Sequence, residues 1–301
     1  MAVMDVVVSG SHGFIGSALV PALTAAGHRP RRLVRGPAAG GDVSWDPDAG
    51  TIDAAALEGT EGVVHLGGVG IGDKRWTPQQ KERIRGSRVR GTTVLAEALA
   101  SLADRPLVLV SASAVGYYGD RGDEILTEES TPGDGFLAGV VRAWEEATAP
   151  AADAGVRVVN MRSGVVQSPA GGALKKQLPL FRFGVGGPLG NGRQWVSWIT
   201  LDDEIAVILH LLGDDTLAGP VNATAPEPVT SAGLARALGK ALHRPAVLPV
   251  PKVGLKLVVG RQMADEMVTA SQRVVPVRLQ AAGFSFRHPA VEPAMAAILD
   301  R

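Results

Sequence analysis

The feature that most constrains the fold is a glycine-rich turn near the start of the chain. The valines Val6–Val8 precede the segment Gly10–Gly16, and apolar residues at helical spacing follow it. A short β-branched run that is apolar on both faces is typical of a buried parallel strand. In such a unit Gly10 allows a tight turn, Gly13 lets a diphosphate approach the backbone, and Gly16 lets the helix pack closely. The pattern therefore predicts a diphosphate site at a helix N-terminus, rather than a plain strand–helix turn.

Strands and helices alternate along the first half of the chain. Four more strands are predicted, at Leu33–Val34, Val63–Leu66, Leu107–Val110 and Val156–Val159. Helices are predicted over Gln79–Ala103 and Val141–Ala154, and later over Asp202–Leu212 and Ser231–Leu242. This alternation indicates an α/β fold, a doubly wound parallel sheet of the Rossmann type.

The pattern changes after residue 165. Residues 168–192 are rich in Gly and Pro, and short helices separated by prolines follow residue 248. We predict a nucleotide-binding Rossmann domain over residues 1–165, with residues 195–245 packing back onto it. Residues 166–194 and 246–301 are predicted to form a smaller, mostly helical C-terminal lobe on the substrate side.

Composition excludes several classes of function. The absence of Cys excludes disulfides, thiolate nucleophiles and Cys-based metal sites, and the six His residues show no metal-ligand spacing. Thirty basic and thirty acidic residues give no net charge, which argues against bulk nucleic-acid or membrane binding but leaves a local basic patch possible. With no segment typical of a membrane span or a signal peptide, we expect a cytoplasmic protein without nucleic-acid or membrane partners.

Arg35 at the end of the second predicted strand favours one nicotinamide cofactor over the other. An NAD site usually has Asp or Glu at this position to hold the ribose 2′-hydroxyl. A guanidinium instead pairs with a 2′-phosphate. NADP(H) is therefore predicted, the alternative being that Arg35 belongs to a solvated basic strand edge.

Several motifs together resemble one family. They are Gly10–Gly16, Arg75-Trp76 with Gly86-Ser87-Arg88, Val110–Gly119 (VSASAVGYYG), Arg162–Val166, Gly171–Leu174 and Gly184–Gly190 leading to Gln194-Trp195. The chain resembles the "epimerase family" proteins, an atypical branch of the extended short-chain dehydrogenases/reductases that ends in a small domain of unknown function. Members bind NADP(H), and their substrates are mostly undefined.

The resemblance implies where the cofactor would lie. The diphosphate would contact Gly10, Ser11, His12, Gly13, Phe14, Ile15 and Gly16. Arg35 would meet the 2′-phosphate, Leu66 and Gly67 the adenosine ribose and phosphates, and Val165 the nicotinamide pocket, with Arg88 nearby. Ser111 and Ser113 are site candidates because of their position at the carboxyl end of the fourth predicted strand. Open α/β sheets place their ligands at the carboxyl ends of the strands.

The catalytic Tyr-x-x-x-Lys pair of this superfamily is missing. Phe136 or Leu137 stands where Tyr would be, and Val140 or Val141 where Lys would be. A phenyl ring cannot exchange a proton, and a valine cannot hold a ribose hydroxyl. The standard mechanism, and with it an ordinary sugar-nucleotide epimerase, is therefore not expected.

Ser113, Tyr117 and Tyr118 are the substitute candidates for catalysis, although packing against the substrate lobe is the simpler explanation of both tyrosines. Lys175, Lys176, Asp202 and Asp203 have simpler explanations as surface charges or as the start of a helix. The leading prediction is an NADP(H)-dependent oxidoreductase or epimerase-like enzyme acting on a small polar substrate between the lobes. The alternative is an NADPH-binding sensor or regulatory protein without turnover; oligomeric state is left open.

Overall fold

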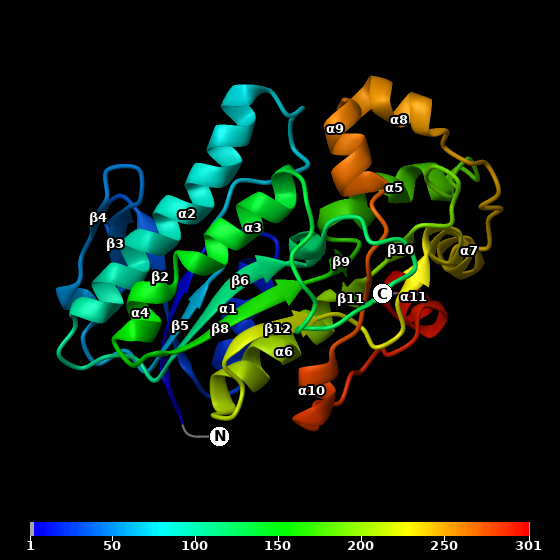
Figure 1. Cartoon of the computed structure of the whole chain (residues 1–301). Coiled ribbons are helices and arrows are strands. Elements are labelled where there is room, and N and C mark those ends of the chain that lie inside the picture. Colours follow the sequence, from blue (N-terminus) through cyan, green and yellow to red (C-terminus); the bar gives the residue numbers. More distant parts are fainter. Residues whose placement is uncertain (1–2, 301) are drawn as a thin grey trace.

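The computed structural model describes residues 3–300 and has an eight-stranded sheet at its centre (Figure 1). The strand order is β12-β8-β6-β5-β1-β2-β3-β4. The strands are β1 (Asp5–Ser9), β2 (Arg29–Arg35), β3 (Val43–Asp46), β4 (Thr51–Ile52), β5 (Gly62–His65), β6 (Val108–Ala114), β8 (Arg157–Ser163) and β12 (Gly219–Ala223). Every neighbouring pair is parallel except β3–β4. The predicted parallel sheet is confirmed.

Helices cover both faces of this sheet. They are α1 (Gly16–Ala25), α2 (Pro78–Ser101), α3 (Phe136–Glu146), α4 (Ala149–Asp153) and α6 (Leu201–Gly213), with short 3₁₀ turns η1 (Ala55–Leu57) and η2 (Val115–Tyr118). Val6 and Val8 pack in one core cluster with α1 and α6, whereas Val7 packs in another with α2 and α4. Because successive side chains of a strand point to opposite faces, β1 must be apolar throughout.

Some element boundaries differ from the predictions. The predicted helix over residues 141–154 is wrong: α3 begins at Phe136, directly after Gly135 (φ 104°), and ends at Glu146, before the separate helix α4. The edge strands β3 and β4 and the strand β12 were not predicted. They are short, of two to five residues, and β12 contains Pro220 and Asn222, which weakens a strand signal.

The remaining residues form the helical region beside the sheet. Its elements are α5 (Gly172–Arg182), α7 (Ser231–Ala241), α8 (Lys252–Val259), α9 (Arg261–Met263), the π-helical turn η3 (Ala264–Val268), α10 (Val277–Ala281) and α11 (Val291–Leu299). Three strand pairs connect them to the sheet domain: β7 (Ile125–Leu126) with β14 (Arg273–Val274), β9 (Val165–Gln167) with β11 (Trp198–Thr200), and β10 (Trp195–Val196) with β13 (Val229–Thr230).

The segment 195–245 is divided between the two regions. Its α6 and β12 pack with the central sheet, whereas α7 shares a core cluster with α5 and α11. Within residues 3–300, no helix has the length and apolar character needed to span a bilayer.

Candidate active site

The glycine turn between β1 and α1 is closely packed. Gly10 has φ +65°, and Gly13 N donates to Gly10 O at 2.9 Å. A Cβ on Gly16 would lie 2.3 Å from Gly10 O, and one on Gly10 would lie 2.9 Å from the Leu66 carbonyl carbon. No side chain fits at either position. The turn, with Ser11 buried and His12 and Gly13 exposed, has the geometry that the sequence predicts.

A serine–histidine pair joins the ends of β1 and β5. Ser9 Oγ lies 2.6 Å from His65 Nδ1 and accepts a hydrogen bond from Leu66 N at 3.1 Å. Burial lowers the pKa of His65 to about 4, so the ring is neutral at pH 7. These contacts, which the sequence analysis missed, hold Leu66 and Gly67 beside the glycine turn.

Phe14 of the glycine turn meets the start of α5. A Cβ on Gly171 would lie 2.2 Å from the Phe14 ring, so the ring fills the space that this glycine leaves. Val165, in the strand β9 that precedes the loop of Gly171, is half-exposed. The loop before α5 therefore borders the predicted cofactor groove.

Arg88 on α2 is a half-buried cation beside the end of β5. Its Nη1 donates to the carbonyl oxygens of Val69 (2.9 Å) and Ile84 (3.2 Å), and its guanidinium carbon lies 4.9 Å from the Trp144 ring centroid. Burial lowers its pKa to about 10. None of the ion pairs among residues 3–300 includes Arg88. A desolvated cation without a carboxylate fits a site that receives an anionic group.

Arg35 is exposed at the carboxyl end of β2. Its Nη1 lies 3.7 Å from Asp48 Oδ2, and the same carboxylate lies 3.4 Å from Arg90 Nη2. Both arginines are accessible from solvent. The predicted 2′-phosphate position thus has a second cation, Arg90, which the sequence analysis did not single out.

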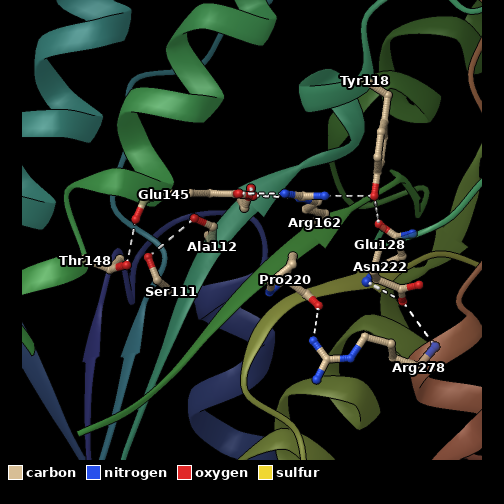
Figure 2. A network of polar contacts seen from close by, with 11 residues as sticks. Ser111, Ala112, Tyr118, Glu128, Glu145, Thr148, Arg162, Pro220, Asn222 and Arg278 are labelled. Carbon is tan, nitrogen blue, oxygen red and sulfur yellow. Dashed lines mark hydrogen bonds and ion pairs between the residues drawn. The ribbon is translucent and has the colours of Figure 1, made fainter. Parts of the chain in front are cut away.

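Ser113, Glu145 and Arg162 form a buried polar group at the carboxyl ends of β6 and β8. Figure 2 shows Glu145 and Arg162 side by side. Ser113 Oγ donates to Glu145 Oε1 at 2.6 Å. Arg162 donates from Nε to Oε1 and from Nη2 to Oε2, both at 2.7 Å. The side chains of Arg162 and Glu145 are only 3 % and 13 % exposed. This bidentate geometry gives a strong, directional ion pair.

The group continues to Tyr118 and Asn222 (Figure 2). Arg162 Nη1 donates to the Tyr118 hydroxyl at 3.0 Å, and that hydroxyl donates to Asn222 Oδ1 at 2.7 Å. Asn222 N in turn donates to Glu128 Oε1 at 3.1 Å. We call Ser113, Glu145, Arg162, Tyr118 and Asn222 the Arg162 network; it links α3 to the strand β12 at the edge of the sheet.

The two tyrosines have different surroundings. Tyr118 is fully buried with both hydrogen-bonding functions of its hydroxyl used, and burial raises its pKa to about 12. A role of Tyr118 as proton donor therefore does not fit this environment, in which its hydroxyl contacts Arg162 and Asn222. Tyr117 is half-buried, and its ring lies 3.5 Å from the Arg162 guanidinium carbon.

Other candidates from the sequence also have defined surroundings. Ser111 is completely buried inside the sheet, which leaves no surface for a cofactor, so its predicted contact does not fit. Asp203 is buried and accepts from the backbone N–H groups of Arg287 and His288, so it anchors the C-terminal segment. Lys176 Nζ donates to Gly72 O at 3.1 Å, so α5 contacts the loop between β5 and α2.

A cavity of about 420 Å³ lies between the loop that follows Tyr118 and the helical region. Its lining includes Asp120, Asp123, Arg193, Gln194, Lys252 and Ser271. Carboxylates, cations and amides thus share one cavity, which suits a small polar ligand.

The sequence analysis did not single out Glu145, Arg162 and Asn222 as candidates for this site. The motifs around Trp144-Glu145 and Arg162-Ser163 were visible, but no spacing in the sequence shows that these side chains meet. Their contact requires the parallel pairing of β6, β8 and β12, which places Ser113 opposite Arg162 and Arg162 opposite Asn222.

Comparisons with known proteins agree with this architecture. Residues 6–222 match the NAD dependent epimerase/dehydratase family, and residues 250–298 match a domain of unknown function, DUF1731. Epimerase family protein Mb2239 of Mycobacterium bovis is 44 % identical over 296 residues, covering 98 % of this chain and 97 % of that protein. Human epimerase family protein SDR39U1 is 35 % identical, covering 98 % of this chain and 100 % of the human protein.

Two crystal structures are similar over nearly the whole chain. That of human SDR39U1 (isoform 2) with NADPH superposes with a TM-score of 0.91 at 34 % identity, covering 99 % and 100 % of the two chains. A nucleoside-diphosphate sugar epimerase from Corynebacterium glutamicum has a TM-score of 0.81 at 39 % identity and covers 99 % of this chain and 58 % of that one.

Proposed function

We propose, from the premise that the chain belongs to the NAD dependent epimerase/dehydratase family, that it is an NADP(H)-dependent oxidoreductase or epimerase-like enzyme with a non-standard proton relay. The observation that carries the proposal is the Ser113–Glu145 hydrogen bond of 2.6 Å, held by Arg162 at the carboxyl edge of the sheet. Ligands of open α/β sheets bind at this edge.

Three features of the structure and one comparison support NADP(H) as the cofactor. The glycine turn offers backbone N–H groups to a diphosphate, and Arg35 offers a guanidinium to a 2′-phosphate. The uncompensated charge of Arg88 lies beside Leu66–Gly68, where an anionic cofactor would neutralise it. The similar human protein was crystallised with NADPH. Bound NADP(H) would supply hydride transfer to or from a substrate carbon.

In this proposal Ser113 and Glu145 move the accompanying proton. When a substrate alcohol is oxidised, its hydroxyl proton passes to Ser113 Oγ while the Ser113 proton passes to Glu145 Oε1. Reduction of the carbonyl runs the same transfers in reverse. Arg162 is a positioning residue, because its bidentate pair fixes the Glu145 carboxylate, and Tyr118 with Asn222 fixes Arg162.

A second candidate is an NADPH sensor without turnover. It is favoured by the loss of the Tyr-x-x-x-Lys pair and by the 4 % exposure of Ser113, whose hydroxyl proton already has a partner. Under this alternative the Arg162 network is only structural. Both candidates share the cofactor and differ in turnover.

Cofactor binding is tested by titrating the protein with NADPH and NADH and following nicotinamide fluorescence. We expect NADPH to bind more tightly and Arg35→Ala to weaken NADPH binding by about 1–3 kcal/mol, the range for a charged hydrogen bond. NADH binding should be unchanged. Arg32→Ala, an exposed arginine of the same strand, is the matched control. If Arg35→Ala weakened the binding of NADPH and NADH equally, Arg35 would be excluded as the 2′-phosphate ligand.

Turnover is tested by screening carbonyl substrates with NADPH. Glu145→Gln should abolish turnover while NADPH still binds, and Glu146→Gln, its exposed neighbour, should leave the rate unchanged. If the wild type binds NADPH and reduces none of the carbonyl compounds, the sensor becomes the better conclusion.

A further inference from the structure

Helix α8 turns an apolar side to solvent. Val253, Leu257 and Val258 are 69–71 % exposed, and none of the eight residues of the helix is buried. Lys252 and Lys256 lie on the opposite side, where both pair with Asp265, at 2.9 and 3.3 Å. Surface helices normally direct their apolar stripe toward the core. Leu255 and Val259 of α8 are half-buried. The helix therefore has a second apolar side, formed by Val253, Leu257 and Val258, that is left exposed.

More exposed apolar side chains lie beside α8. Phe183, at the end of α5, is 83 % exposed, and Val247, in the loop before α8, is 75 % exposed. The two segments are adjacent, because Arg244 donates to Arg182 O at 3.1 Å. Figure 1 shows α8, this loop and the end of α5 at one corner of the molecule. The α8 corner comprises Phe183, Val185, Val247, Leu248, Val253, Leu257 and Val258.

The α8 corner is set in a basic part of the chain. Residues 182–193 and 240–261, which include the segments of this corner, contain seven Lys and Arg and no Asp or Glu, although the whole chain has thirty of each sign. Asp265 is shared by Lys252, Lys256 and Arg261, so these three cations outnumber their carboxylate. Lys240 pairs with Glu292, and Arg182 and Arg244 lie beside Phe183. The corner is thus apolar with an excess of positive charge around it.

We propose that the α8 corner binds the surface of an anionic phospholipid bilayer. Exposed apolar side chains enter the boundary between headgroups and acyl chains, and the surrounding cations pair with lipid phosphates. A second copy of this chain is a poor occupant, because a symmetric dimer would bring the same cations together. The apolar residues project from a corner made of three short segments, and a bilayer receives such a surface without matching its shape.

This surface corresponds to the local basic patch that the neutral net charge left possible. The expectation of no membrane partner rested on the net charge of the whole chain and on the lack of a segment typical of a membrane span, and neither bears on a local surface of this kind. Binding here is peripheral, and it is independent of the proposed cofactor and its chemistry.

The test is co-sedimentation of the full chain with phosphatidylcholine vesicles, with and without phosphatidylglycerol. We expect sedimentation with the anionic vesicles only, weakened at high salt. The double variant Leu257→Ser/Val258→Ser should reduce binding on the order of tenfold or more, since apolar insertion is lost. Leu107→Ser, an equally exposed leucine (68 %) before β6, is the control and should bind as the wild type does. Arg244→Gln/Arg261→Gln should weaken binding to the anionic vesicles.

Several outcomes would overturn the proposal. They are no sedimentation with either vesicle, equal binding to both, or equal loss in the Leu107→Ser control. A dimer in solution that Leu257→Ser/Val258→Ser converts to a monomer would identify a second copy as the occupant instead.

Discussion

The two parts of the candidate site at the sheet's carboxyl edge are built in different ways. We call the glycine turn Gly10–Gly16 the cofactor side and the Arg162 network the substrate side, after the roles proposed for them. On the cofactor side the fit depends on small residues close in sequence, as where Gly13 N donates to Gly10 O. On the substrate side the Arg162 network joins residues 17, 32 and 104 positions apart. The cofactor side thus depends on the conformation of a short stretch of backbone. The substrate side depends on several charged and hydroxyl-bearing side chains that must all be present.

This difference determines how each side fails. A buried polar network is stable only when every member has its partner. If one side chain is removed, the remaining polar groups stay buried without a hydrogen-bond partner, which destabilises the folded protein. A glycine turn has no such partners, and it fails when a side chain occupies the space that glycine leaves. Substitutions on the two sides should therefore differ in how much they lower the free energy of unfolding and in whether they also weaken cofactor binding.

Removal of the Glu145 carboxylate should have the largest effect on stability. Glu145→Ala leaves the Arg162 charge buried without its partner, which costs about 3–5 kcal/mol in the free energy of unfolding. Denaturant titration measures the loss. Glu146→Ala, exposed on the same helix, is the control and should change stability by less than about 0.5 kcal/mol. Equal effects in the two variants would show that the ion pair adds no net stability.

Glu204 should make stability depend on pH. This fully buried carboxyl accepts from Ser163 Oγ at 2.6 Å, and burial raises its pKa from 4.5 to about 7. The folded protein therefore binds the proton more tightly than the unfolded chain does. The contribution of protonated Glu204 to the free energy of unfolding is fully present below about pH 4.5 and is lost as the pH rises toward 7.

Glu204→Gln tests this dependence, because an amide stays neutral throughout. Between pH 4.5 and 7 the variant should lose the decline in stability that the wild type shows, a difference of a few kcal/mol above pH 7. Exposed Glu97→Gln serves as the comparison. The two pH profiles are measured by denaturant titration, and parallel profiles for wild type and Glu204→Gln would refute the shifted pKa.

Gly16→Ala should disturb the cofactor side through the backbone. Its Cβ would lie 2.3 Å from Gly10 O and 2.7 Å from Ser11 Cα, so the turn must move. We expect a cost of about 1–3 kcal/mol in stability, as for other overpacked sites, together with weaker NADPH binding. In helix α3, Gly139→Ala adds a Cβ that meets nothing within 4 Å and should instead stabilise by up to about 1 kcal/mol. Normal NADPH binding by Gly16→Ala would mean that the turn does not hold the cofactor.

The same difference explains what the sequence could predict. The strand β1, the glycine turn and α1 were predictable because the signals for strand, turn and helix are contiguous. Helix α3 was placed five residues too late, since Phe136-Leu137 carries no capping signal and Gly135 supplies the helix start through its φ of 104°. The spacing of residues close in sequence is therefore enough to predict the fold of the cofactor side.

The substrate side could be predicted only in part. Ser113 was found because it ends a predicted strand, but its partner Glu145 was not, because their contact depends on how α3 lies over β6. Tyr118 was proposed for catalysis because the sequence shows its chemistry and not its burial. The short strand β12, which brings Asn222 to Arg162, gave no clear periodic signal.

The smallest and most selective test compares the two adjacent tyrosines. Tyr118→Phe removes the hydroxyl between Arg162 Nη1 and Asn222 Oδ1, leaving both buried groups without that partner, which costs about 1–3 kcal/mol. Tyr117 contacts Arg162 through its ring face at 3.5 Å, and phenylalanine keeps that face, so Tyr117→Phe should be nearly neutral for stability. Denaturant titration of both variants separates these cases. If Tyr117→Phe nevertheless lowers turnover while its stability is unchanged, the Tyr117 hydroxyl contacts the substrate. If both variants are neutral, the Arg162 network ends at Arg162, and Tyr118 and Asn222 contribute nothing to holding it.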